Sequence, residues 1–287
     1  MTRTWRILKR TTVSFYDDQM TQHAAALTYY TLMSLFPALL FGISLLGLLG
    51  QYPGTYNAVI SYLHDVVPSA TLNAIDSSLR SAIQQKGNAT AGLVLATLTA
   101  LYGLTGVLEA ARRALNVVFG VEHGRSFLHR KARDIASSFI LIGLVVITLI
   151  LVFVGGKLAD HVFGNEVVNA WNIVRWPLAV VVAMLAFAYV YYVTPDLPED
   201  EKKFRLMTPG AATAVVIWIA VSWGFSQYLS HYSEVNAIYG TFAGAIILVG
   251  WVWLTNCALL IGAELNSALT RERESRASDL TAAPAPR

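Results

Sequence analysis

The sequence predicts an all-α, polytopic membrane protein with six transmembrane helices. Hydrophobic residues make up 55% of the 287 residues and charged residues only 14%, whereas charged residues make up about 25% of an ordinary soluble domain. Six stretches lack Asp, Glu, Lys and Arg, and each holds the roughly 20 apolar residues that a membrane helix needs. This composition excludes a soluble protein and a disordered chain. The single cysteine, Cys257, excludes a disulfide framework.

Charged residues bound the predicted spans, because an ionised side chain is costly in the hydrocarbon core. We expect a membrane domain over residues 24–269, after an N-terminal segment, 1–23. The tail, 270–287, is charged and then rich in Ala and Pro, which predicts disorder. The expected spans lie near residues 24–50, 89–108, 135–156, 176–195, 208–230 and 238–265.

The first outer connection, residues 51–88, has a pattern of its own. Apolar residues recur there at helical spacing on both sides of Pro68. This pattern predicts two amphipathic helices in the first outer loop. Residues 56–86 either bind a membrane surface or an envelope protein partner, or pack on the ends of the protein's own spans.

The distribution of Lys and Arg predicts the orientation, because cytoplasmic connections are enriched in these residues. Seventeen of the 21 lie in the two terminal segments and in the connections 109–134 and 196–207, and four lie in the alternate connections. We therefore expect both termini on the cytoplasmic side of the membrane.

The sequence lacks the motifs of common catalytic sites. It contains no HExxH, CxxC, GxSxG or Walker loop, and its six histidines are scattered along the chain. Metal-dependent cleavage of RNA needs clustered carboxylates and histidines. We therefore expect no catalytic residue, no metal site, no cofactor and no enzymatic activity.

Polar residues within or beside the spans are candidates for a substrate path, because burying them is costly unless they are paired or used. Three hydroxyls share one face of the first span, where they either line a polar cavity or bond their own helix backbone in a packed interface. The candidates are Thr28, Thr31, Ser34, Glu109, Asn256 and Glu264.

Two of these candidates are carboxylates at the predicted inner ends of spans. Glu264 is interpreted either as a partner for a proton, a cation or a lipid head group, or as half of a structural ion pair with Arg112, Arg113 or Arg205. Glu109 stands four residues before Arg113, a spacing typical of local helix stabilisation. Asn256 needs a partner across a helix interface.

The connection after the second span interleaves cations with apolar residues. Nucleic acid is one partner for such a segment, but a basic cluster beside an inner leaflet more commonly contacts anionic lipid head groups. The cluster also serves as the orientation signal and needs no ligand for that role. We expect membrane lipids as partners and no nucleic acid, while the oligomeric state is not indicated. The predicted head-group contacts are Arg112, Arg113, Arg125, Arg130, Lys131 and Arg133.

Four segments together resemble the YihY/BrkB family of bacterial inner-membrane proteins, once labelled ribonuclease BN. They are AAALTYYTLMSLFPALL (24–40), LEAARRALNVVF (108–119), TPGAATAVVIW (208–218) and IYGTFAGAIILVGWVWLTNCALLIGAELN (238–266). The resemblance covers roughly residues 15–270. It implies a multi-pass protein of the bacterial cytoplasmic membrane that transports or translocates a lipid-like envelope component. The alternatives are a non-catalytic membrane scaffold for envelope partners and, less favoured, a ribonuclease.

Overall fold

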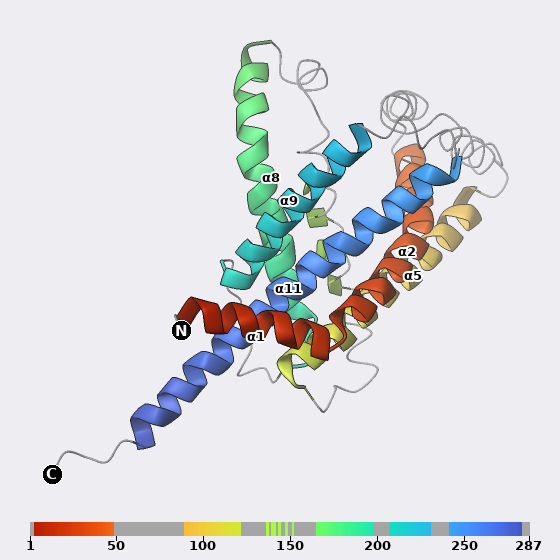
Figure 1. Ribbon diagram of the computed structural model, residues 1–287. Coiled ribbons are helices and arrows are strands. Elements are labelled where there is room, and N and C mark those ends of the chain that lie inside the picture. Colours follow the sequence, from red (N-terminus) through yellow and green to blue (C-terminus); the bar gives the residue numbers. More distant parts are fainter. Residues whose placement is uncertain are drawn as a thin grey trace. The chain divides into compact units, whose positions relative to one another are not determined.

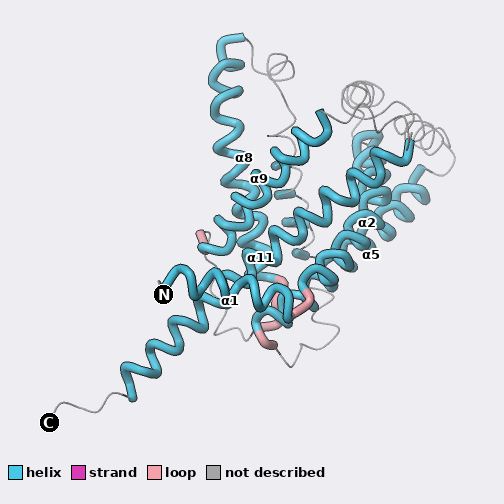
Figure 2. The backbone as a smooth tube through the Cα atoms, viewed as in Figure 1, coloured by secondary structure: helices cyan, strands magenta, loops and turns pink. Residues whose placement is uncertain are grey.

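The computed structural model describes residues 3–48, 89–121, 165–197, 207–230 and 241–282, together with parts of 136–151. These ranges are almost entirely helical and contain no strand (Figures 1 and 2). The predicted all-α class is therefore confirmed. The amphipathic helices predicted within 51–88 lie outside the described residues. The helices are α1 (Arg3–Asp17), α2 (Met20–Leu48), α5 (Ala89–Phe119), α8 (Asn165–Val193), α9 (Pro209–Ser230) and α11 (Thr241–Ala282).

The helices extend beyond the apolar stretches that predicted them. α5 was expected to end near residue 108 and continues to Phe119, and α8 begins 11 residues before the expected 176. Charge-free stretches mark the part of a helix that hydrocarbon can cover. Polar turns continue the same helix, because each added residue gains a backbone hydrogen bond without a new nucleation cost.

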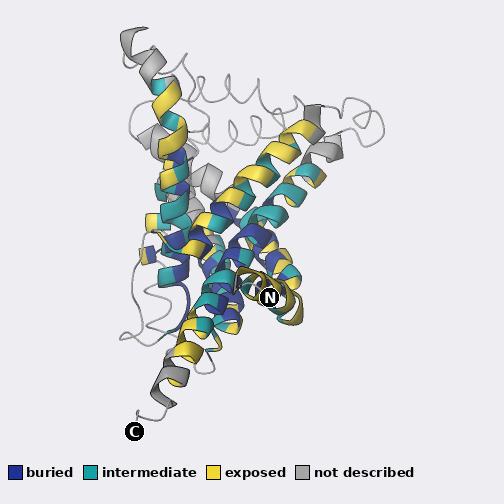
Figure 3. Cartoon of the chain, turned by 60° about the vertical axis from the view of Figure 1, so that its left-hand side comes forward, coloured by how far each residue is buried: buried dark blue, intermediate teal, exposed yellow. Residues whose placement is uncertain are grey.

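The predicted disorder of the tail is wrong for residues 270–282, which form the last turns of α11. Thr270 donates its hydroxyl to the carbonyl oxygen of Asn266 at 3.0 Å, and Arg276 pairs with Glu272 at 3.5 Å one turn earlier. These turns grow from a long apolar helix, so a composition too polar to nucleate structure alone is still helical. Figure 3 shows that residues 270–276 are mostly exposed, whereas buried residues lie in the preceding turns of the helix.

Three helical segments are long and apolar enough to cross a membrane: Ile173–Val193, Pro209–Gln227 and Ile246–Arg276. This search covered the described residues, so the predicted number of six spans stays a prediction. The three segments agree with the predicted fourth, fifth and sixth spans.

The chain divides into two compact units. The first unit comprises Met1–Ala25, Leu108–Val221 and Leu254–Arg287. Its core combines small side chains with a few large ones, among them Met20, Leu115 and Leu260. Small residues let helix backbones approach closely in a membrane protein.

Close approach is most evident where α9 meets α11 in this unit. A Cβ added to Gly262 would lie 2.5 Å from the carbonyl oxygen of Gly210 and 2.5 Å from the hydroxyl of Tyr191. That hydroxyl donates a hydrogen bond to the carbonyl oxygen of Leu259 at 2.6 Å. The two glycines therefore allow α8, α9 and α11 to meet.

The second unit comprises Ala26–Val107 and Ser222–Trp253. Within it α2 packs tightly on α5: a Cβ on Gly103 would lie 2.8 Å from the Cβ of Ser34, and one on Gly106 would lie 2.8 Å from the ring of Tyr30. The indole of Trp251 donates to the hydroxyl of Ser222 at 3.2 Å, which joins α11 to α9.

Candidate functional site

Buried and half-buried polar side chains gather in the first unit. They come from the end of α1, the second half of α5, the loop after α8 and the middle of α11. Polar groups at such depth are expected to be paired or used, because an unpaired buried charge is costly. We call this set the polar cluster. Its members are Asp18, Glu109, Arg112, Asn116, Asp196, Glu264 and Asn266.

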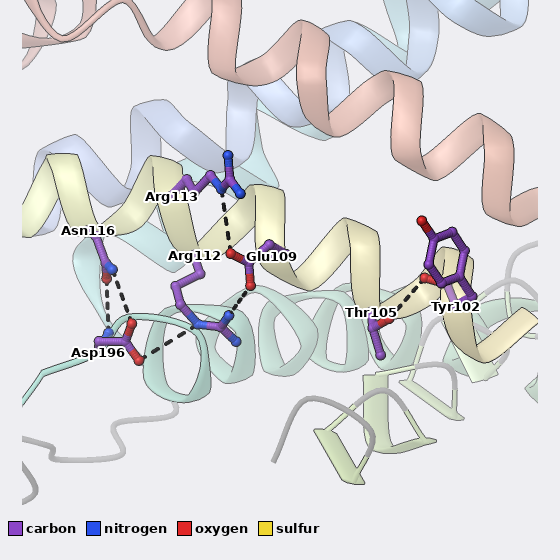
Figure 4. Close-up of polar contacts among 7 residues, drawn as sticks. All are labelled: Tyr102, Thr105, Glu109, Arg112, Arg113, Asn116 and Asp196. Carbon is purple, nitrogen blue, oxygen red and sulfur yellow. Dashed lines mark hydrogen bonds and ion pairs between the residues drawn. The ribbon is translucent and has the colours of Figure 1, made fainter. Parts of the chain in front are cut away.

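Arg112 is the central cation of the cluster (Figure 4). Its side chain is 4% exposed and lies between two carboxylates. Nη1 donates to Glu109 on the preceding turn at 2.5 Å, and Nε lies 3.7 Å from Oδ1 of Asp196, whose side chain is 3% exposed. Glu109 also accepts Arg113 at 3.5 Å. Two arginines thus balance two carboxylates, so the buried charges are compensated.

Asn116 fixes Asp196 at the end of α8. Its side-chain nitrogen donates to Oδ2 of Asp196 at 3.3 Å, and its side-chain oxygen accepts the backbone N–H of Asp196 at 2.9 Å. Because the amide bonds both the carboxylate and the backbone, it holds the loop after α8 against α5 in one geometry. Figure 4 shows these contacts beside those of Arg112.

Glu264 of α11 is a buried carboxylate for which the described residues provide no ion pair, unlike Glu109 and Asp196. Its residue is 2% exposed, and Oε1 has no hydrogen-bond partner. The charged groups that act on it are the Asp18 carboxyl, which repels a negative charge, and the Arg271 guanidinium, which attracts one. Asp18 therefore adds a like charge beside Glu264 and does not compensate it.

The surroundings of this carboxyl pair are well ordered by hydrogen bonds. Arg271 donates to the carbonyl oxygen of Val118 at 3.2 Å, and Ser267 donates to the same oxygen at 2.9 Å. These bonds satisfy the Val118 carbonyl oxygen in the last turn of α5, where carbonyls lack partners within the helix. Partial burial lowers the pKa of His23, and the nearby Asp18 charge opposes this shift.

The predicted ion pair between Glu264 and an arginine of a neighbouring connection is wrong for Arg112 and Arg113. Both bind Glu109, and Arg112 also approaches Asp196. Among the described residues no ion pair joins either arginine to Glu264. Arg205, the third predicted partner, lies outside the described residues. Arg112 lies beside the loop after α8, because the hydrogen bonds between Asn116 and Asp196 hold the Asp196 carboxylate next to the Arg112 guanidinium.

Asn266 joins α11 to the start of α9. Its side-chain oxygen accepts the backbone N–H of Gly210 at 2.8 Å, and its nitrogen donates to the hydroxyl of Thr208 at 3.1 Å. The Thr208 hydroxyl in turn accepts the N–H of Ala211 at 3.0 Å, as an N-cap does. The amide therefore completes the cap of α9.

The hydroxyls of the predicted substrate path bond within α2. Thr31 donates to the carbonyl oxygen of Leu27 at 2.8 Å, and Ser34 donates to that of Thr31 at 2.8 Å. Thr28 is buried. Together with the tight contact between Ser34 and Gly103, this arrangement corresponds to the packed-interface alternative for these residues. Asn256 lies half-buried on α11.

The predicted head-group contacts separate into two groups. Arg113 is 75% exposed, which fits contact with lipid. Arg112 does not fit, because its side chain is enclosed with Glu109 and Asp196. The other predicted contacts, Arg125, Arg130, Lys131 and Arg133, lie outside the described residues.

Sequence reasoning missed Asp18, Asn116 and Asp196 as members of the cluster. The two aspartates were used only as boundaries of charge-free stretches. The sequence did contain a signal for Asp196. This aspartate directly follows Pro195 at the end of an apolar span, and a carboxylate in that position needs a partner if it is buried. No comparable signal marked Asn116 on the polar part of α5.

Long apolar helices and charges buried in compensated groups define this chain as an integral, all-helical membrane protein. The family model described as virulence factor BrkB matches residues 11–286. The chain belongs to this family, as the four quoted segments predicted.

The relatives agree with this assignment. The chain is 28% identical over 257 residues to the ribonuclease-like protein YfkH of Bacillus subtilis (strain 168), over 88% of this chain and 90% of that protein. It is 27% identical over 266 residues to a UPF0761 membrane protein of Pseudoalteromonas translucida, over 89% of this chain and 83% of that one. A UPF0761 membrane protein of Aliivibrio fischeri is 27% identical over 267 residues, covering 88% and 79%. No solved structure matches the chain.

Proposed function

We propose that this protein transports or translocates a lipid-like envelope component across the bacterial cytoplasmic membrane. The observation that carries the proposal is Glu264, a buried carboxyl group with an unpartnered oxygen in a long apolar helix. Ionisable residues inside membrane segments are rare and mark substrate or ion pathways and proton relays.

The contrast with the rest of the polar cluster supports this assignment. Glu109, Arg112 and Asp196 form a compensated group, and a structural role explains them fully. Glu264 faces a second carboxyl, Asp18, and this pairing costs stability unless a proton or a ligand is held there. Arg112 and Asp196, the other charged residues buried in the described part of the chain, compensate each other, so Glu264 has a reason beyond packing to be kept.

The lipid-like substrate is inferred from the resemblance to the YihY/BrkB family, and anionic head groups would contact exposed cations such as Arg113. The name of YfkH refers to a ribonuclease. That activity is not part of the proposal, because metal-dependent RNA cleavage needs clustered ligands. The sequence contains no HExxH or CxxC motif, and its six histidines are scattered along the chain.

Glu264→Gln tests the proposal. The change keeps the size of the side chain and removes its acid chemistry, so we expect lipid movement to fall at least about tenfold with little change in thermal stability. The assay uses purified protein in proteoliposomes that contain a fluorescent phospholipid, and a membrane-impermeant reductant measures how much label reaches the outer leaflet.

Glu272→Gln is the matched control, because Glu272 lies two turns later on the same helix and pairs with Arg276 at the surface. It should leave lipid movement unchanged. Equal lipid movement in Glu264→Gln and in wild type would contradict the role of Glu264.

A non-catalytic scaffold is the second candidate, favoured by the α2 hydroxyls that bond their own backbone. It predicts that proteoliposomes with and without the wild-type protein move lipid at the same rate. In that case the transport proposal fails as a whole, whatever the variants do.

The orientation is proposed from the Lys and Arg distribution, with both termini in the cytoplasm. A reporter enzyme that is active only outside the cytoplasm should be active when fused after Gly87 and silent when fused after Ser275. A reporter fused at the same two sites that is active only in the cytoplasm should give the opposite pattern. Activity of the first reporter at Ser275 would overturn the orientation.

A further inference from the structure

The helix α1 divides into three sectors that the function proposed above does not use. Successive residues of a helix are rotated by about 100°, so its 15 residues cover all sides. One sector packs against the first unit: Thr11 and Phe15 are buried there, four residues apart. The remaining two sectors face away from the protein.

The second sector is apolar and exposed. Trp5 is 52% exposed, Leu8 51% and Tyr16 68%, and their spacing of three and eight residues places them on one side of the helix. Single exposed apolar residues are ordinary on protein surfaces. Three large apolar residues on one side of a single helix, two of them aromatic, form an exposed apolar stripe. Such a stripe is typical of a surface that binds a partner or a membrane.

The third sector is basic. Arg6, Lys9 and Arg10 are exposed beside the apolar stripe, and Arg3 adds a fourth cation to the helix. The only acidic residue of α1 is Asp17, at its end. An apolar stripe flanked by cations is the pattern of a helix that lies in a membrane interface, with its apolar side in the acyl boundary and its cations at the head groups.

The connection to α2 keeps α1 close to the membrane. Only Asp18 and Gln19 separate the two helices, and Gln19 adopts a left-handed backbone conformation with φ of 54°. Its carbonyl oxygen accepts the N–H groups of Gln22 and His23 in the first turn of α2. The apolar part of α2 begins at Ala24, so α1 ends within about two helical turns of the predicted first span.

We propose that α1 is an interfacial helix that binds anionic phospholipid head groups through Arg6, Lys9 and Arg10 while Trp5, Leu8 and Tyr16 enter the membrane interface. Charge complementarity selects the partner, because the exposed sectors carry cations and no acidic side chain before Asp17. Trp and Tyr are also the side chains enriched at membrane interfaces. This binding would hold whether or not the protein moves lipid.

Spin labels on the full-length protein test the depth of α1. Leu8→Cys and Arg10→Cys are made separately in a Cys257→Ser background, because Cys257 is the single cysteine. The labelled proteins are placed in nanodiscs of phosphatidylglycerol and phosphatidylcholine. The label at position 8 should collide mainly with lipid-soluble oxygen, and the matched label at position 10 mainly with a water-soluble nickel complex. Equal nickel access at both positions would overturn the proposal.

A second comparison tests the head groups. In nanodiscs of phosphatidylcholine alone, or with Arg6, Lys9 and Arg10 all changed to Gln, the label at position 8 should gain nickel access severalfold. The charge-preserving variant Arg6→Lys/Arg10→Lys should keep the original depth. An unchanged depth in neutral lipid would contradict anionic recognition, since the apolar stripe alone would then anchor the helix.

Discussion

Replacing Gly262 with alanine is expected to lower the stability of the protein by about 1–3 kcal/mol, as overpacking of a tight core does. The new Cβ would lie 2.5 Å from the carbonyl oxygen of Gly210, 2.5 Å from the Tyr191 hydroxyl and 2.8 Å from the Cβ of Ala214. The Gly210 oxygen belongs to the backbone and the Ala214 carbon is a Cβ atom, so neither can move aside by a side-chain rotation. Only the Tyr191 side chain could rotate away. Moving the tyrosine would break its bond to the carbonyl oxygen of Leu259.

Gly250→Ala is the matched control on the same helix, because nothing lies within 4 Å of its added Cβ. This change should be neutral or slightly stabilising, since alanine is the better helix former by about 1 kcal/mol. Thermal unfolding of both variants in one detergent gives the comparison. A Gly262→Ala protein as stable as the Gly250→Ala protein would show that α9 and α11 do not approach as closely as described.

The positions of the helices followed from the sequence because charge is excluded from hydrocarbon. The predicted spans 208–230 and 238–265 fall on α9 and α11 for this reason. Helix ends could not be predicted in the same way. The polar turns of α5 and α11 are held by ion pairs and by packing in the first unit, and neither appears in a count of charge-free residues.

The site was predicted only in part. Glu109 and Glu264 were recognised because each is a lone carboxylate at the end of an apolar span. Their partners were not recognised, because the spacing along one helix tells which residues share a face and not which helix lies opposite. Asn116 and Asp196 are 80 residues apart in the sequence, and Asp18 precedes Glu264 by most of the chain.

Removing Arg112 is expected to have the largest effect of any single substitution considered for this protein. Arg112→Gln leaves Asp196 and Glu109 without their buried cation, and breaking a buried pair in this way costs about 3–5 kcal/mol. The free energy of unfolding in detergent, from chemical or thermal denaturation, measures the loss. Asp196→Asn should cost less, because Arg112 keeps Glu109 as its partner.

The neighbouring arginine provides the control for this experiment. Arg113 binds the same carboxylate as Arg112 but is 75% exposed, so Arg113→Gln should change stability by no more than about 0.5 kcal/mol. The double variant Arg112→Gln/Asp196→Asn should regain about 1 kcal/mol or more relative to Arg112→Gln alone, because it removes a charge that had lost its partner. Equal losses for Arg112→Gln and Arg113→Gln would mean that burial does not set the strength of this network. Additive losses in the double variant would mean that Arg112 and Asp196 are not coupled, and that the end of α8 is held to α5 by Asn116 alone.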